Sequence, residues 1–172
     1  MADADRIADV EQGPEQRAHP EWQPGADLSG QQLDGLDLSG MRLSGANLRG
    51  VHLQSANLKG TWLDGADLTG ANFAGADLQF AILGGAILDD ASFAGANMHS
   101  VNLVGARGTR VDFSKANLYY ARPGNAVLHT CIFRQANIQR AIFRRADLQG
   151  SDFTGAQGQA NFDRANREGV RE

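Results

Sequence analysis

A large apolar residue recurs every five positions along the chain, from Leu28 to Phe153, without a slip in register. Of the 27 positions in this series up to residue 158, 24 hold Leu, Phe, Met or Ile, and the exceptions are Gly108, Pro123 and Gly158. A period of five matches neither the period of about 3.6 of a helix nor the period of about 2 of a strand. The chain is therefore predicted to turn after every unit.

The positions around this apolar residue are also regular. Two places before it, Ala occupies 18 of the 27 positions, and two places after it, Gly occupies 14, so the unit reads A-(D/N)-L-x-G. Glycine gives the backbone the freedom that a tight corner needs. We predict that the alanine and the large apolar side chain both point inward and fill a narrow core.

The spacing of the phenylalanines indicates how many units make one full coil. Stacked side chains in a solenoid tend to be alike, and five of the eight Phe residues lie 20 positions apart. Twenty residues per coil at five per side give four sides, and the 27 units then make about 6.75 coils. At a strand spacing of roughly 4.8 Å the tube is on the order of 32 Å long. The sequence thus predicts an all-β solenoid with a structural core column of Phe73, Phe93, Phe113, Phe133 and Phe153.

Units such as A-D-L-S-G, A-N-L-R-G and A-D-L-T-G resemble the motif of the pentapeptide-repeat proteins over about residues 26–167. The resemblance implies a right-handed quadrilateral β-helix. The best known members of that family protect type II DNA topoisomerases from quinolones or toxins by mimicking the shape and charge of DNA. They usually dimerise through an apolar C-terminal element. A shared fold implies the architecture and leaves the function open.

The repeat divides the chain into three segments. Residues 1–25 are predicted to be an acidic, proline-containing N-terminal arm or cap, with Trp22 covering the open edge of the first coil. Residues 26–167 are the β-helix and residues 168–172 a C-terminal tail. The end of the repeat is polar, so the family's apolar dimerisation element is not expected, although a homodimer remains an alternative.

Three interruptions of the repeat predict local departures from the regular coil. Gly108 and Pro123 replace inward side chains, and proline cannot donate to the ladder between coils, so we expect local bulges there. After Gly158 one unit is a residue short, which marks the approaching end of the repeat.

We find no constellation for catalysis and expect no cofactor or metal. A filled tube has no evident pocket, and no histidine falls beside the Ser and Asp side chains to make a nucleophile–base pair. The single cysteine, Cys131, lies in an inward alanine-type position and is predicted to be a small buried thiol. No window approaches the ~18 apolar residues of a membrane span, and no signal peptide is evident. These features favour a cytoplasmic protein that is not an enzyme. His52, His99 and His129 fall at different sides or heights of the tube, and His19 precedes the repeat, so a metal site is not expected.

Charge is distributed unevenly along the predicted tube. Residues 26–100 carry eight Asp against three basic residues, whereas residues 101–159 carry three Asp against eight basic residues. DNA mimicry over the whole length is hard to reconcile with this dipole, because a DNA-binding groove would repel the basic half. The basic half has no recognised nucleic-acid motif, so direct nucleic-acid binding is not expected. The acidic face that DNA mimicry would use comprises Asp37, Asp64, Asp67 and Asp77.

Asn and Asp repeat down one predicted side of the tube, where stacking would allow a ladder of side-chain hydrogen bonds. The residues of this column are Asp37, Asn57, Asp77, Asn97, Asn117 and Asn137.

Aromatic, aliphatic and arginine residues gather in outward positions along one predicted corner, a composition typical of binding hot spots. Our leading hypothesis is a non-catalytic interaction module that presents this rigid corner to a protein partner of unknown identity. Two alternatives stay open beside it: these residues pack on a neighbouring loop or on one of the termini, or the protein is a DNA-mimicking inhibitor or protector of a type II DNA topoisomerase. The candidate partner-binding residues are Phe80, Ile82, Tyr119, Tyr120, Arg122, Arg140 and Ile142.

Overall fold

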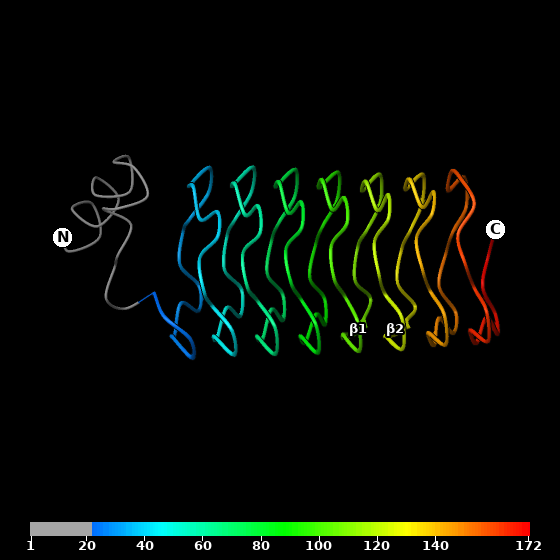
Figure 1. The fold of residues 1–172 in the computed structure, drawn as a ribbon, viewed down its shortest axis with the longest axis horizontal. Helices are drawn as coiled ribbons and strands as arrows, with labels where there is room; N and C mark the ends of the chain where they lie inside the picture. The colour runs from blue at the N-terminus through cyan, green and yellow to red at the C-terminus, as the bar shows by residue number, and fades with distance from the viewer. Residues whose placement is uncertain (1–21) are drawn as a thin grey trace.

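The computed structural model describes residues 22–172, which wind into one four-sided tube of stacked coils (Figure 1). Two short strands, β1 (Arg107–Thr109) and β2 (Val127–His129), pair in parallel, and the other coils are joined by isolated parallel bridges. No helix occurs among the described residues. Consequently, none of residues 22–172 belongs to a helix of the length and hydrophobicity that crossing a bilayer takes.

The bridges confirm the predicted coil of twenty residues. Each outward residue pairs with the residue twenty positions later, as in Asp27 with Asn47 and Asn97 with Asn117. We number the four sides I to IV after their first bridged residues. These are Asp27 for side I, Gln32 for side II, Asp37 for side III and Arg42 for side IV. Sides I and III are opposite, as are sides II and IV.

The core is filled as predicted. The large apolar side chains and the alanines that precede them are buried along nearly the whole tube. The phenylalanine column is a continuous stack: the ring centroids of Phe73 and Phe93 are 4.9 Å apart, and those of Phe133 and Phe153 are 4.4 Å apart. The centroid of the Phe113 ring lies 5.3 Å from that of Phe93 and 4.8 Å from that of Phe133.

Every corner of the tube places one residue in the left-handed region of φ. In the first half of the tube this residue is usually glycine, as at Gly65 with φ 66°. In the second half other residues take the position, and each has a strained backbone because its Cβ crowds the following carbonyl. An unbroken run of such corners comprises Arg110, Lys115, Tyr120, Asn125, Thr130, Gln135, Arg140 and Arg145.

The bulge expected at Gly108 is absent. Gly108 pairs with Leu128 in the regular twenty-residue register, within the longest strand pairing of the described chain. The space that a side chain at residue 108 would take is filled by Val111, whose Cγ2 would lie 2.5 Å from an added Cβ. A larger residue at a neighbouring alanine-type position thus compensates for the missing one.

The bulge expected at Pro123 is absent as well. Asn102 and Arg122 remain bridged twenty positions apart, and Asn125 still donates to the carbonyl of Arg144 at 3.0 Å. Proline has no N–H, so the ladder bond that this position would donate to the carbonyl of Ile142 is lost. One hydrogen bond is missing while the register of the coils is kept.

The packing of Val111 against Gly108 predicts how substitutions at these two positions change stability. Gly108→Ala is expected to lower the free energy of unfolding by about 1–3 kcal/mol through overpacking against Val111. Val111→Ala opens the space, so the double variant should lose less stability than the sum of the two single variants. Urea unfolding of the four proteins measures this coupling. Additivity within about 0.5 kcal/mol would contradict the compensation.

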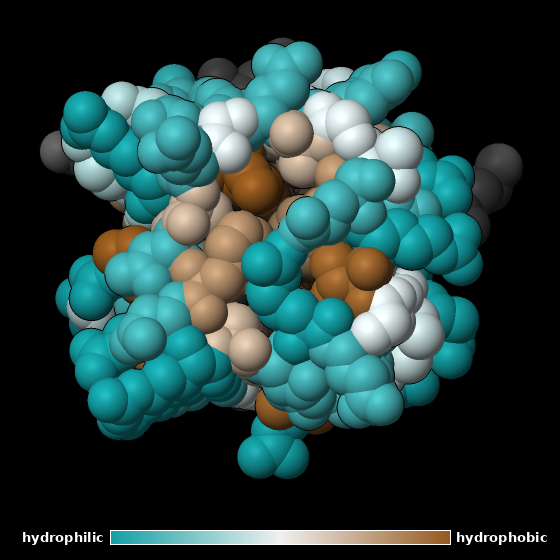
Figure 2. All heavy atoms as spheres, turned by 90° about the vertical axis from the view of Figure 1, so that its right-hand side faces the viewer, coloured by the Kyte–Doolittle hydropathy of each residue, from teal (hydrophilic) through white to brown (hydrophobic). Residues whose placement is uncertain are grey.

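At the C-terminal end the register shortens by one residue, as the sequence predicts. Bridges change from a spacing of twenty to nineteen, as in Ile142 with Asn161, and they continue to the pair Asp152 with Arg171. Hydrogen bonding between coils therefore extends into the segment predicted as a tail. Figure 2 shows this end of the tube, with apolar side chains in the middle and hydrophilic ones around them. Phe162 and Val170 pack there against the core.

Of the N-terminal arm, residues 1–21 lie outside the described part of the chain. Trp22, proposed as the cover of the first coil, packs against the hydrophobic core.

Candidate functional site

An aromatic cluster lies at the corner between sides III and IV, and we call it the aromatic corner: Phe80, His99, Tyr119, Tyr120 and Arg140. The ring of His99 meets Phe80 edge-on at 5.5 Å and stacks on Tyr119 at 5.5 Å. Tyr119 and Tyr120 meet edge-on at 4.6 Å. Arg140 lies over the ring of Tyr120 at 5.2 Å and donates a hydrogen bond to its hydroxyl. Four of the seven predicted partner-binding residues thus form one connected cluster.

Two rings of the aromatic corner are exposed, whereas His99 and Tyr119 are half-buried. The Phe80 side chain keeps 58% of its surface accessible and Tyr120 keeps 39%. Phe80, Tyr120 and Arg140 also hold left-handed φ angles of 60°, 57° and 62°. Glycine would adopt these angles without strain, so the aromatic residues reduce stability at positions where the repeat offers a relaxed alternative. The other non-glycine corners hold the same φ, so it is the exposure of large rings that distinguishes Phe80 and Tyr120 from them.

His99 is the member of the cluster that the sequence reasoning missed. The two tyrosines lie two coils beyond Phe80. The ring of His99 lies between them and contacts Phe80, Tyr119 and Tyr120. The signal was available, because residue 99 precedes Tyr119 by one coil of twenty in the same outward position.

The other three predicted partner-binding residues lie on side IV, next to the aromatic corner. Ile82 is half-buried and bridges to Asn102, which in turn bridges to Arg122. Arg122 and Ile142 line a hollow of about 200 Å³ at the far edge of the same side. The remaining residues that line the hollow are Val104, Gly124, Asn125, Arg144 and Arg145.

The residues predicted for an acidic face do not share one side of the tube. Asp37 and Asp77 are in the bridge column of side III, whereas Asp67 is in that of side I, the opposite side. Asp67 and Asp77 are also paired with cations, at 3.0 Å from Arg49 and 3.1 Å from Lys59. Asp64 accepts a hydrogen bond of 2.7 Å from the hydroxyl of Ser44.

The predicted side-chain ladder on side III is present in most of its steps. Asn117 donates to Asn97 and Asn137 donates to Asn117, both at 3.1 Å, and Asn97 donates to Asp77 at 3.4 Å. Each described bond of this ladder is donated toward the N-terminal end of the tube. The series that begins at Asn137 ends on the carboxylate of Asp77. Partial burial raises the pKa of Asp77, but hydrogen bonds from Gln79 and Lys59 outweigh it and lower the pKa overall. Side III is therefore a polar, internally bonded surface.

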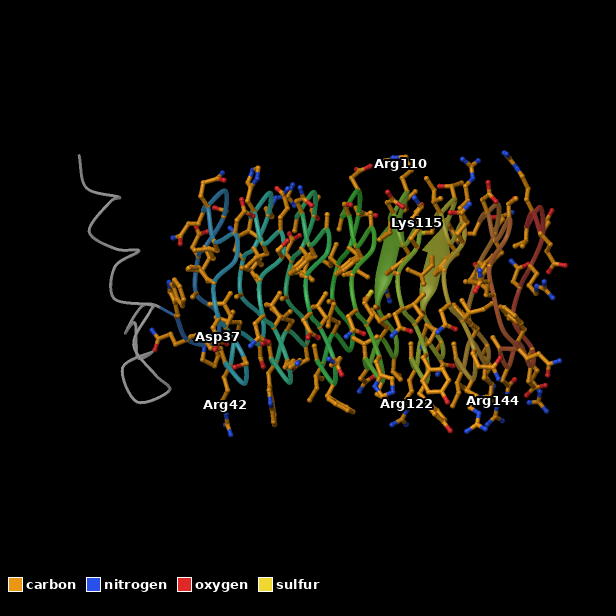
Figure 3. All side chains as sticks on the ribbon, turned by 90° about the horizontal axis from the view of Figure 1, so that it is seen from above. Asp37, Arg42, Arg110, Lys115, Arg122 and Arg144 are labelled. Carbon is orange, nitrogen blue, oxygen red and sulfur yellow. The ribbon has the colours of Figure 1, made fainter. Side chains whose placement is uncertain are left out.

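The basic residues of the second half separate into paired and unpaired groups. Arg110 binds Asp90 through two bonds of 2.7 Å, and Arg134 lies 2.7 Å from Asp152. Within residues 22–172, Arg122 and Arg145 have no carboxylate partner. In Figure 3, Arg110 projects from one edge of the tube and Arg122 from the opposite edge. The unpaired positive charge on the Arg122 edge adjoins the aromatic corner.

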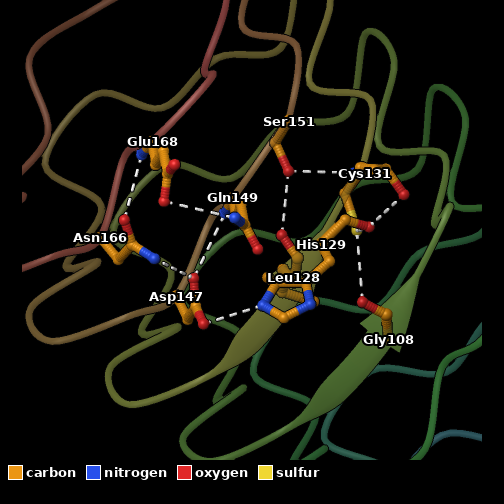
Figure 4. Close-up of polar contacts among 10 residues, drawn as sticks. Gly108, Leu128, His129, Cys131, Asp147, Gln149, Ser151, Asn166 and Glu168 are labelled. Atoms are coloured by element: carbon orange, nitrogen blue, oxygen red, sulfur yellow. Dashed lines mark hydrogen bonds and ion pairs between the residues drawn. The ribbon is translucent and has the colours of Figure 1, made fainter.

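Cys131, His129 and Asp147 come close in space but do not form a catalytic group (Figure 4). The buried thiol of Cys131 contacts the carbonyl oxygens of Gly108 and His129 at 3.6 and 3.4 Å, and burial raises its pKa to about 12. A nucleophilic cysteine needs the opposite shift. His129 Nε2 lies 2.8 Å from Asp147 and faces away from the thiol. The predicted buried cysteine is thus confirmed.

No group of three or more metal-ligating side chains occurs among residues 22–172.

Asp152 makes acid stability testable. The hydroxyl and the backbone N–H of Thr154, together with Arg134, lower the pKa of this carboxyl group to about 2. Since the folded pKa is below the usual value of about 4, the charged form stabilises the fold above that value, and the contribution is lost as the pH falls toward 2. Asp152→Asn should therefore destabilise the protein at about pH 6 and much less at about pH 2.5 in urea unfolding. An equal loss at both pH values would contradict this assignment.

Comparison with known proteins supports the architecture. The pentapeptide repeat profile matches in 8 copies over residues 24–50, 32–70, 52–90, 71–107, 91–122 and 124–157. The chain therefore belongs to the pentapeptide repeat family, and its fold is the right-handed quadrilateral β-helix. Among curated proteins, none matches the sequence.

Two solved structures with TM-scores above 0.5 show the same fold. Two trypsin-treated forms of QnrB1, described as a plasmid-mediated fluoroquinolone resistance protein, have TM-scores of 0.53 and 0.55 at 22% and 21% identity. The matches cover 84% and 87% of this chain and 71% and 90% of those chains. HetL of the cyanobacterium Nostoc, a pentapeptide repeat protein involved in heterocyst differentiation regulation, is 25% identical over 86% of this chain and 85% of its own, with a TM-score of 0.41.

Proposed function

We propose that this protein is a non-catalytic interaction module whose aromatic corner binds another protein. The observation that carries the proposal is the exposure of Phe80 and Tyr120, at 58% and 39%, within one connected cluster of rings on the outside of the tube. Tyrosine and arginine are the residues that most often dominate protein interfaces. The ring contacts through His99 and the bond from Arg140 hold the cluster rigid, so binding orders few additional side chains.

The strain allows binding to be separated from folding. Phe80→Gly with Tyr120→Gly restores the residue that the corner conformation favours, so stability should change by no more than about 1 kcal/mol in either direction. Binding of the partner should fall at least tenfold, because two central interface side chains are removed. The matched control is Ile87→Ala with Val127→Ala, which removes comparably exposed apolar side chains from side I.

Capture from the lysate of the native cell at near-physiological salt, with proteins identified by mass spectrometry, tests the proposal. A specific protein bound by the wild type and the side I control but lost from the glycine variant is the expected result. Equal retention by all three would overturn the proposal. Topoisomerase subunits lost only when Asp64, Asp67 and Asp77 are neutralised would favour the DNA-mimicking alternative instead.

A further inference from the structure

The hollow on side IV has a chemistry that the aromatic corner lacks. Its rim carries the guanidinium groups of Arg122, Arg144 and Arg145, and its apolar walls are Val104 and Ile142, each 40% exposed. Arg144 is partly neutralised by Asp163 at 3.3 Å, whereas Arg122 and Arg145 have no carboxylate partner within residues 22–172. The hollow therefore presents unpaired positive charge beside exposed hydrocarbon.

From these observations we infer that the hollow binds an acidic peptide segment of the protein partner. A carboxylate side chain pairs with Arg122 and Arg145, with which it forms charge-assisted hydrogen bonds. An apolar side chain of the same segment packs on Val104 and Ile142. The combination of arginine donors with exposed hydrocarbon suits a peptide, because a free phosphate would leave these apolar side chains uncovered. This inference rests on the proposed function, since it specifies the chemistry of the partner at the edge of the same surface.

The test titrates the full chain, labelled with nitrogen-15, with a capped hexapeptide of alternating glutamate and leucine. We expect saturable shifts of the amide signals around the hollow, and at least tenfold weaker binding when glutamine replaces glutamate in the peptide. Inorganic phosphate is titrated in parallel. Equal binding of phosphate and peptide, or no saturable shift with the glutamate peptide, would overturn the inference.

Variants locate the binding. Arg122→Glu with Arg145→Glu should weaken binding at least tenfold, and Gly124→Leu should do the same by filling the hollow without changing charge. The matched control, Arg107→Glu with Lys115→Glu, makes the same change in net charge on other sides and should leave binding within about twofold. Equal loss in the control would mean that total charge, and not the hollow, attracts the peptide.

The corner variant separates this inference from the proposed function. Phe80→Gly with Tyr120→Gly should leave the affinity for the hexapeptide unchanged. If the hexapeptide fails to bind the wild type while that variant still loses its protein partner in capture, the acidic peptide is wrong and the interaction module stands.

Discussion

Phe113→Ala is expected to lower the free energy of unfolding by about 3–5 kcal/mol. The Phe113 ring is fully buried and is stacked between Phe93 at 5.3 Å and Phe133 at 4.8 Å. Truncation leaves a cavity on the axis of the tube that the neighbouring coils cannot close, because their hydrogen-bond ladders fix the distance between them. Urea unfolding followed by circular dichroism measures the loss.

The matched control is the same substitution at an exposed phenylalanine. Phe80→Ala should change stability by no more than about 0.5 kcal/mol. The contrast between the two variants depends only on whether the ring lies inside or outside the tube. Similar losses for both would contradict the placement of the phenylalanine column in the core.

Gly158→Ala is expected to lower the free energy of unfolding by about 2–3 kcal/mol. Residue 158 has a φ of 94°, and an added Cβ would lie 2.6 Å from the Cα and 2.7 Å from the backbone nitrogen of Gln139. Backbone atoms cannot rotate away, so relief requires the last coil to separate from the one before it. This is the place where the spacing of the bridges changes from twenty to nineteen.

Gly105→Ala separates the two causes of this loss. Gly105 has a comparable left-handed φ of 69° with no atom within 4 Å of an added Cβ, so only the backbone strain of about 1 kcal/mol applies. Native-state hydrogen exchange should also show lost protection in residues 159–172 of the Gly158→Ala protein. Equal destabilisation by the two substitutions would contradict a close approach of the coils at Gly158.

Most of the architecture could be predicted because the repeat fixes each residue's direction. The twenty-residue spacing of phenylalanines predicts the stack that the ring distances confirm, and the burial of Cys131 follows from its alanine-type position. The bulges expected at Gly108 and Pro123 were wrong. The sequence at one position shows that a side chain or an N–H is missing. It does not show that Val111 fills the space or that the remaining hydrogen bonds between coils keep the pairing in register.

The candidate site was predicted in part for a related reason. The outward column places Phe80, Tyr120 and Arg140 on one corner, and the structure brings them together. The role of His99 depends on the orientation of its ring, which no period encodes. The hollow beside the corner is lined by residues of three successive coils, among them Val104, Gly124 and Arg144, and their joint effect appears only in the folded chain.

Site-specific photo-crosslinking from the aromatic corner tests the central claim most directly. A photoreactive phenylalanine analogue in place of Phe80 retains the aromatic ring and its exposure, and the same analogue in place of Val127 on side I serves as the control. Irradiation in the native cell should give a discrete crosslink to one protein from position 80 and none to that protein from position 127. Equal crosslinking from both positions would contradict the assignment of the aromatic corner as the binding surface, and so would the absence of a crosslink from position 80.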